Sequence, residues 1–189
     1  VVLATGAHER PLVFANNDVP GCMLASAVST YINRYGVVPG KNLVLMTTND
    51  HAYQTALDWA DAGRKVVAIV DTRPNPEGDL VEDAKRRGLH IITGSAVIEA
   101  HGGKRVNAVS VASINENGES VTGKISRLQC DTLASSGGWS PVVHLSCHTA
   151  SRPAWNDEAV GFVPGATIQN QLTAGGINAS YGLGDCLKE

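Results

Sequence analysis

The sequence is short of charge and has no long apolar run, and each shortage excludes a class of protein. Charged residues make up 17% of the 189 residues and the formal net charge is −3, so the chain offers no basic field for nucleic acid. No apolar stretch is long enough to cross a bilayer, and no signal-peptide pattern opens the chain. We therefore expect neither a nucleic-acid partner nor a membrane partner.

Paired cysteines and metal-ligand spacings are also missing. The four cysteines are scattered and form no C-x-x-C pair: Cys22, Cys130, Cys147 and Cys186. Scattered cysteines in a chain of this size are typical of reduced thiols in a cytoplasmic protein. Three histidines share no ligand spacing and are expected at the surface: His51, His90 and His101. The sequence thus predicts a cytoplasmic protein without a metal site.

The stretch from Lys41 to Asp71 carries the clearest structural pattern. An apolar run over 42–46 is typical of a buried parallel strand, and alanines and a leucine then recur on one helical face up to Gly63. A second apolar run over 66–70 ends at Asp71. Strand, helix and strand make a βαβ unit, which is typical of the first half of a dinucleotide-binding fold.

The turn after the first of these strands departs from the glycine fingerprint of such folds. Where Gly-x-Gly-x-x-Gly is expected, the chain has Thr-Thr-Asn-Asp-His-Ala over 47–52. Thr47 is β-branched, Asn49 puts a side chain where phosphate would lie, and Asp50 places a carboxylate that caps the helix and repels phosphate. We interpret the unit as scaffold that fills its own anion site. Asp71 could in principle bind a ribose hydroxyl. Without a phosphate site beside it, however, we expect Asp71 to be a solvated acid at the end of the strand.

The remaining pattern predicts helices, short strands and an antiparallel meander. Helical spacing over 24–35 ends at a glycine, as does that over 80–87. The sequence Asn117-Gly118 is a strong hairpin signal that links two of the expected strands. Strands are expected over 89–93, 96–100, 106–114 and 120–125.

Recognition of a family rests first on the N-terminal motif. The run V-V-L-A-T-G-A-x-x-R-P, with Ala4, Thr5 and Gly6 followed by Pro11, resembles the Ala-Thr-Gly motif of two-dinucleotide flavoproteins. Longer runs resemble the alpha subunit of heterotetrameric sarcosine oxidase: LATGAHERPLVFANNDVPG, LASAVSTYINRYGVVPGKN, TTNDHAYQTALDWADAG and SSGGWSPVVHL. Because the chain begins inside an apolar strand that we expect to be buried, without an initiator Met, we expect it to be an interior fragment of a longer polypeptide.

This resemblance implies a fold and a division into domains. The fold class is α/β, an FAD/NAD(P)-binding (glutathione-reductase-like) Rossmann-type fold in three layers, with a parallel sheet plus an antiparallel meander. Residues 1–38 would be a truncated part of a first nucleotide-binding domain. Residues 39–128 would form a complete inserted Rossmann-like domain, and residues 129–189 would return to the first domain.

The resemblance also implies a cofactor site. In FAD-binding relatives an Asp stands where this chain has Gly176 and bonds the ribitol, so its absence favours NAD, with the flavins elsewhere in the complex. The alternative is that Gly175 and Gly176 only open a helix beginning near Asn178, and that the glycines at 137 and 138 only serve a turn. The expected cofactor-binding residues are Ala4, Thr5, Gly6, Gly137, Gly138, Gly175 and Gly176.

The function implied is the NAD-binding region of the alpha subunit of a multi-subunit, flavin-dependent amine oxidase that demethylates sarcosine oxidatively. The other oxidase subunits would be its partners. No catalytic residue is expected here: Ser146, Cys147 and His148 lack a nucleophile elbow and a paired acid. The fragment alone is expected to be inactive and to bind NAD weakly or not at all. Two alternatives remain: an NAD(P)H-dependent flavoprotein reductase, and a non-catalytic assembly module with vestigial nucleotide sites.

Overall fold

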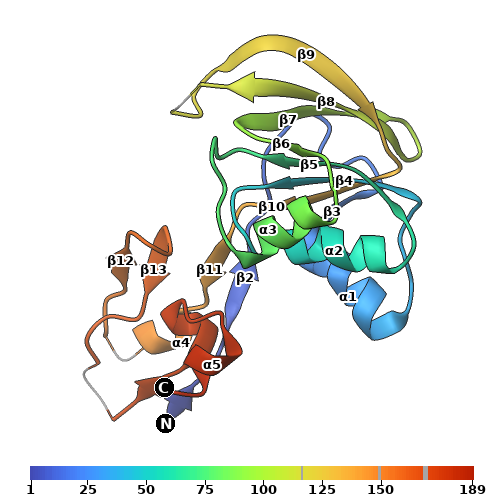
Figure 1. Cartoon of the computed structure of the whole chain (residues 1–189). Helices are drawn as coiled ribbons and strands as arrows, with labels where there is room; N and C mark the ends of the chain where they lie inside the picture. Colours follow the sequence, from blue (N-terminus) through green and yellow to red (C-terminus); the bar gives the residue numbers. More distant parts are fainter. Residues whose placement is uncertain (116, 149, 168–169) are drawn as a thin grey trace. The chain divides into compact units, whose positions relative to one another are not determined.

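A computed structural model describes residues 1–115, 117–148, 150–167 and 170–189 (Figure 1). The chain divides into two compact units. Unit 1 comprises residues 1–10 together with 139–189, and unit 2 comprises residues 11–138. No helix in the described ranges is both long and apolar enough to span a membrane.

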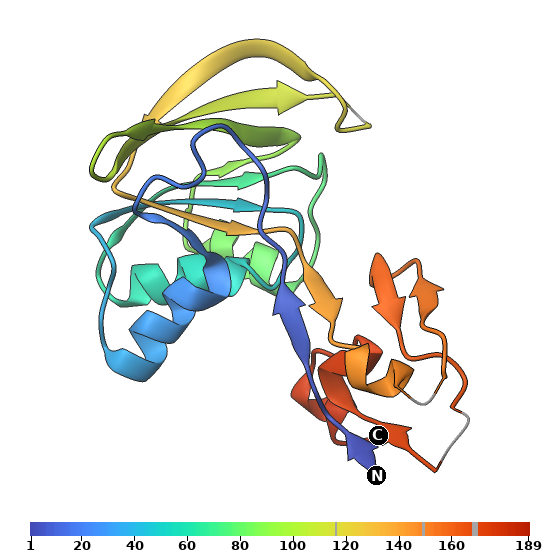
Figure 2. The same ribbon diagram turned by 180° about the vertical axis from the view of Figure 1, so that it is seen from behind.

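Unit 2 is built on a five-stranded sheet whose neighbouring strands are all parallel. Helices cover one face of this sheet and a three-stranded antiparallel sheet covers the other, as Figures 1 and 2 show from opposite sides. In sheet order the parallel strands are β3 (Cys22–Leu24), β10 (Thr132–Ser136), β4 (Asn42–Thr47), β5 (Lys65–Asp71) and β6 (Ile91–Ile92). The covering elements are α1 (Ala25–Tyr35), α2 (Tyr53–Asp61), α3 (Asp79–Arg86), β7 (Ser95–Gly102), β8 (Val106–Ile114) and β9 (Val121–Gln129).

The central strand β4 shows why the sheet is covered on both faces. Leu43 and Leu45 pack into the core under the helices, whereas Val44 and Met46 pack into the core against the antiparallel sheet. Successive side chains of a strand point to opposite faces, so a continuous apolar run needs two apolar layers. The expected βαβ unit is therefore confirmed, and both of its strands are central.

Two glycines that the sequence marks as turn positions adopt left-handed backbone conformations in the structure. Gly36 ends α1 with φ of +64° and its N–H bonds to the carbonyl of Ile32. Gly118 has φ of +70°, and its N–H donates to Asn115 in the hairpin that joins β8 to β9. Only glycine adopts such left-handed backbone conformations readily, which is why the sequence reveals these positions.

The grouping of elements differs from the domain division expected from sequence. Residues 11–38 and 129–138 were expected with the first nucleotide-binding domain, but their elements β3, α1 and β10 belong to unit 2. There β10 pairs with β3 on one side and with β4 on the other. The three-part division of the domains stays a prediction about the family.

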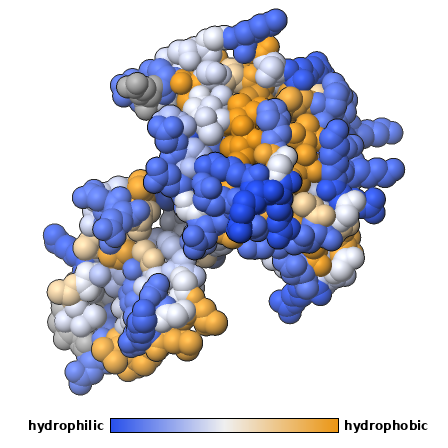
Figure 3. Space-filling model, in the orientation of Figure 1, coloured by the Kyte–Doolittle hydropathy of each residue, from blue (hydrophilic) through white to orange (hydrophobic). Residues whose placement is uncertain are grey.

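Unit 1 consists of short strand pairs and single helical turns. Contrary to expectation, the opening strand is not buried, since Val1 and Val2 are 84% and 63% exposed, and the surface there is apolar in Figure 3. The helix expected near Asn178 is instead a 3₁₀ turn that ends there. The pairs are β1 (Val2–Leu3) with β14 (Leu172–Thr173), β2 (Ala7–Glu9) with β11 (Trp139–Pro141), and β12 (Ala154–Asn156) with β13 (Gly161–Val163). The turns are α4 (His144–Cys147), η1 (Gly175–Asn178) and α5 (Leu183–Cys186).

Candidate functional site

Two glycine-bearing segments from opposite ends of the sequence meet in unit 1. A Cβ atom placed on Gly176 would lie 3.3 Å from Cα and C of Gly6 and from N of Ala7. The N–H of Ala174 donates a 3.0 Å hydrogen bond to the carbonyl of Leu3, beside the parallel pairing of β1 with β14. The structure thus brings together the Ala4–Gly6 and Gly175–Gly176 segments that the sequence analysis assigned to one site.

Thr5 and Gly6 hold this edge through bonds to Val142. The hydroxyl of Thr5 donates to the carbonyl of Val142 over 2.7 Å, and the N–H of Val142 donates to the carbonyl of Gly6 over 2.9 Å. Gly6 has φ of +74°, a conformation that a side chain would strain. The Thr5 hydroxyl thus ties this segment to the backbone at Val142.

A carboxylate already bonds the donors around Gly175. The N–H of Gly175, which has φ of +77°, donates to Oε2 of Glu189 over 2.5 Å. The hydroxyl of Ser180 donates to Oε1 over 2.5 Å, and Nδ2 of Asn178 donates to Oε2 over 3.0 Å. These bonds, first that of Ser180 and then that of Gly175, lower the pKa of Glu189 below its ordinary value. The donors therefore suit an anionic oxygen.

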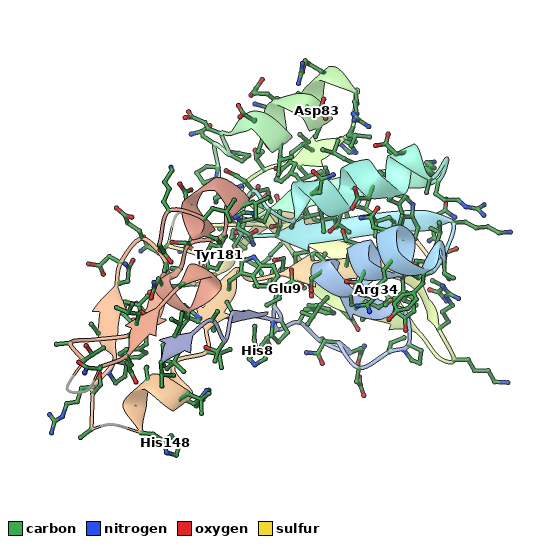
Figure 4. The ribbon with its side chains drawn as sticks, turned by 90° about the horizontal axis from the view of Figure 1, so that it is seen from below. His8, Glu9, Arg34, Asp83, His148 and Tyr181 are labelled. Carbon is green, nitrogen blue, oxygen red and sulfur yellow. The ribbon has the colours of Figure 1, made fainter. Side chains whose placement is uncertain are left out.

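Sequence reasoning missed Glu189 and Ser180 entirely. Neither belongs to a motif, and an exposed acid has no pattern that marks its partner. Nearby, the ring of Tyr181, labelled in Figure 4, lies 6.2 Å from the ring of Trp139. Burial raises the pKa of Tyr181. This part of unit 1 thus combines backbone N–H groups, a hydroxyl and two aromatic rings.

Gly137 and Gly138 belong to unit 2, where they directly follow β10. Gly138 has φ of +88°, so its backbone conformation by itself favours glycine. A role for these two residues in cofactor binding stays a prediction.

The turn after β4 is closed by its own side chains. The N–H of Asn49 donates to Oγ1 of Thr47 over 3.0 Å, and that hydroxyl donates to the carbonyl of Asn49 over 2.8 Å. The side chain of Asn49 accepts from the N–H of Ala52 over 3.3 Å and donates to Oγ of Ser136 over 3.0 Å. Asn49, not the expected Asp50, thus satisfies an N–H at the start of α2. Asp50 pairs instead with Arg73.

Asp71 is not the solvated acid expected from sequence, because its side chain is fully buried. Its Oδ2 accepts from the hydroxyl of Tyr53 over 2.8 Å and from Nη2 of Arg73 over 2.8 Å. Its Oδ1 accepts from Nε of Arg73 over 3.1 Å. The expectation failed because Tyr53 lies in a helix whose packing on the strand only the tertiary structure shows.

The hydroxyl of Ser146, in α4, is engaged with the backbone. Ser146 is buried and its hydroxyl donates to the carbonyl of Val143 over 2.7 Å. His148, labelled in Figure 4, directly follows α4. Within the described ranges, no three His, Cys, Asp or Glu side chains are grouped so that they could hold a metal ion. The four cysteines are free thiols, as expected.

Comparison with family models finds no match. Among curated relatives, the chain is 43% identical over 189 residues to the sarcosine oxidase alpha subunit of Corynebacterium sp. (strain P-1), covering 99% of this chain and 19% of that protein. It is 40% identical to the sarcosine oxidase alpha subunit of Rhizobium meliloti (strain 1021), and this match covers 100% of this chain and 18% of that protein. An opine oxidase subunit of Agrobacterium tumefaciens (strain Ach5) is 28% identical over 98% of this chain and 38% of its own length. The chain spans about a fifth of the length of the sarcosine oxidase relatives.

Among solved structures, the chain is similar to thioredoxin reductases. For the enzyme of T. acidophilum the TM-score is 0.73 at 18% identity, covering 97% of this chain and 58% of that one. For the enzyme of Lactococcus lactis the TM-score is 0.68 at 17% identity, and the match covers 95% of this chain and 57% of that one. At such identities the likeness speaks for the fold alone, and it confirms the expected α/β fold of the FAD/NAD(P)-binding class.

Proposed function

We propose that this chain, which is homologous over its whole length to part of the sarcosine oxidase alpha subunit, is the NAD-binding region of the alpha subunit of a multi-subunit, flavin-dependent amine oxidase. The comparisons confirm the resemblance found in the sequence. The proposed substrate is a secondary N-methyl amine such as sarcosine, which the oxidase demethylates oxidatively. The flavins and the other subunits are the proposed partners of this region.

The observation that supports a dinucleotide in unit 1 is the meeting of Gly6 with the turn at Gly175 and Gly176. The backbones of Gly6 and Gly176 approach each other closely. The carboxylate of Glu189 accepts from the N–H of Gly175 and from the hydroxyl of Ser180, so these donors suit an anionic oxygen. These groups fit the negatively charged phosphates of a dinucleotide. A bound nicotinamide ring would supply a two-electron hydride acceptor.

The residues of this chain would then bind and orient rather than react. The N–H of Gly175 and the hydroxyl of Ser180 would donate to the dinucleotide in place of Glu189. The bonds of Thr5 and Gly6 to Val142 would keep the adjoining backbone rigid. Amine oxidation itself is assigned to other parts of the protein.

The choice of NAD over FAD rests on Gly176. An aspartate at this place would bond a ribitol hydroxyl of FAD, and NAD has no ribitol. The close contact with the Gly6 backbone gives a second, steric reason for glycine at 176. Because this steric reason does not depend on which cofactor binds, the preference for NAD needs a direct chemical test.

The nucleotide should be released with acid from the full-length protein and identified by mass spectrometry. We expect NAD in stoichiometric amount. FAD alone bound to this region would overturn the argument from Gly176, and no nucleotide at all would favour the assembly module. A Gly176→Ala variant should retain less NAD than a Gly184→Ala variant, because a Cβ at 184 meets nothing within 4 Å.

The reductase alternative requires unit 2 to bind a pyridine nucleotide at the turn after β4. The N–H groups of Asn49 and Ala52 in that turn already donate within the chain. We therefore expect NADH to leave the protein's flavin oxidised under anaerobic conditions. Rapid reduction of the flavin by NADH would favour the reductase instead.

A further inference from the structure

In unit 2 the carboxyl ends of β4 and β5 lie side by side. Thr47 and Asp71 are register partners at the last position of the two parallel strands. In open α/β sheets a dinucleotide binds at the carboxyl ends of such strands, with its ribose on an acid at the end of the second strand. Asp71 holds that position here.

Asp71 has no acceptor capacity left for a ribose. Its carboxylate accepts from the backbone N–H of Arg73 over 2.9 Å, in addition to two bonds from the Arg73 guanidinium and one from Tyr53. A carboxylate offers about four lone-pair sites, so four donors saturate it. The side chain is also completely shielded from solvent.

Arg73 extends this cluster from the end of β5 to the turn before α2. Its Nη2 lies 2.7 Å from Oδ1 of Asp50, in the turn before α2, and 2.8 Å from Oδ2 of Asp71, at the end of β5. One guanidinium therefore joins the turn to the strand. The planar guanidinium and the carboxylate of Asp71 match in a fork geometry, which fixes the orientation of the arginine side chain.

The backbone donors that a pyrophosphate would use are also occupied. The N–H of Thr48 donates to the carbonyl of Ser136 over 3.2 Å, and that of Tyr53 donates to the carbonyl of Asp50 over 3.0 Å. Those of Asn49 and Ala52 donate to side chains of the same turn. Three N–H groups of the turn and that of the first residue of α2 are thus engaged within unit 2.

We propose that Arg73 is a specificity-determining residue, which closes the carboxyl end of β4 and β5 in unit 2 by bridging Asp50 and Asp71 and so restricts dinucleotide binding to unit 1. The guanidinium takes the place of a ligand and supplies the contacts that a bound ribose would otherwise make. The restriction to unit 1 rests on the proposed function, whereas the closure of unit 2 rests on the contacts above.

Hydrogen exchange with mass spectrometry on the full-length protein tests both parts. NAD⁺ and ADP-ribose at millimolar concentration should slow exchange in residues 4–7 and 174–178 and leave 47–53 and 71–75 unchanged. Slower exchange in 47–53 or 71–75 on adding either ligand to the wild-type protein would overturn the proposal. No change in any of the four segments would contradict the proposed function and leave the closure standing.

Substitution of Arg73 tests the bridge itself. Arg73→Gln should speed exchange in 47–53 by about tenfold or more, because the turn loses its charge-assisted contact with the strand. Arg86→Gln is the matched control, since Arg86 on α3 is 75% exposed and pairs with Asp83 on the same helix; it should leave 47–53 unchanged. If Arg73→Gln does not fold, Arg73→Lys, which keeps the charge but loses the fork, should give a smaller increase. Unaltered exchange in 47–53 of a folded Arg73 variant would refute the bridge.

Discussion

The hydroxyl of Tyr53 donates a 2.8 Å hydrogen bond to Oδ2 of Asp71, and both side chains are fully buried. Tyr53 begins α2 and Asp71 ends β5, so this bond ties the start of the helix to the end of the strand. A buried carboxylate is costly unless polar partners compensate it, and Tyr53 and Arg73 are those partners.

Tyr53→Phe should destabilise the protein by about 1.5–3 kcal/mol, because it removes a hydrogen bond to a buried charged group. Urea unfolding followed by circular dichroism measures the loss. Tyr35→Phe is the control, since Tyr35 is 59% exposed, and it should change stability by less than about 0.5 kcal/mol. Equal losses in the two variants would show that the Tyr53 bond is not stabilising.

The same tyrosine should make stability depend on alkaline pH. Burial, and then the hydrogen bond to Asp71, raise the pKa of Tyr53 above that of an exposed tyrosine. A raised folded-state pKa contributes stability that is complete below the unfolded pKa of about 10 and is lost progressively as pH rises above it. Unfolding free energies measured between about pH 8 and about pH 11 should fall more steeply for the wild-type protein than for Tyr53→Phe. Parallel declines would contradict this assignment.

Gly176→Ala should destabilise unit 1 by about 1–3 kcal/mol. The added methyl group would press on the backbone of Gly6 and Ala7, at 3.3 Å, and backbone yields less readily than a side chain. Gly184→Ala should be neutral or slightly stabilising, because that glycine lies in α5 with open space around it. Thermal unfolding of the two variants, side by side, distinguishes them, and a Gly176→Ala protein as stable as Gly184→Ala would disprove the close approach.

Glu189→Gln should tighten NAD⁺ binding by roughly two- to fivefold, because a neutral amide competes less well for the N–H of Gly175 and the hydroxyl of Ser180. Isothermal titration calorimetry measures the affinity. In the wild-type protein the lowered pKa of Glu189 means that its contacts persist above the ordinary glutamate pKa and are lost as pH falls through the folded value. Lys188→Gln is the control, since Lys188 contacts Asp185 instead. Weaker binding by Glu189→Gln would show that the carboxylate assists the ligand.

Two of the four thiols should resist alkylation in the native state. Burial raises the pKa of Cys22 to about 11 and that of Cys130 to about 12. Since the thiolate is the reactive form, iodoacetamide at neutral pH should leave both unmodified until urea unfolds the protein. Peptide mass spectrometry measures the modification, and rapid native labelling of Cys130 would contradict its burial.

Predictions from sequence were most accurate where a single local rule decides. The buried strand β4 and the glycine at the end of α1 follow from a continuous apolar run and from left-handed backbone, and both were recognised. The hairpin at Asn117-Gly118 belongs to the same group. For the candidate site, the sequence marked the Ala4–Gly6 and Gly175–Gly176 segments, and the structure shows them in contact.

Predictions failed where a residue's environment depends on distant parts of the chain. Asp71 was expected in solvent because the turn after β4 lacks the glycines of a phosphate site, but Asp71 is buried and bonds Tyr53 from the helix. The contact of Glu189 with Gly175 could not be predicted either, because no sequence motif marks this exposed carboxylate.

The sequence by itself determined the kinds of elements in this protein, the βαβ unit and the family to which its motifs point. These depend on side-chain period, on glycine conformation and on residue identity, all of which are local. Only the tertiary structure decided which donors stay available, since that depends on groups brought together across the fold. In unit 2 Asp71, Arg73 and Tyr53 satisfy one another inside the fold, whereas in unit 1 the half-buried donors of Gly175 and Ser180 bond the surface carboxylate of Glu189.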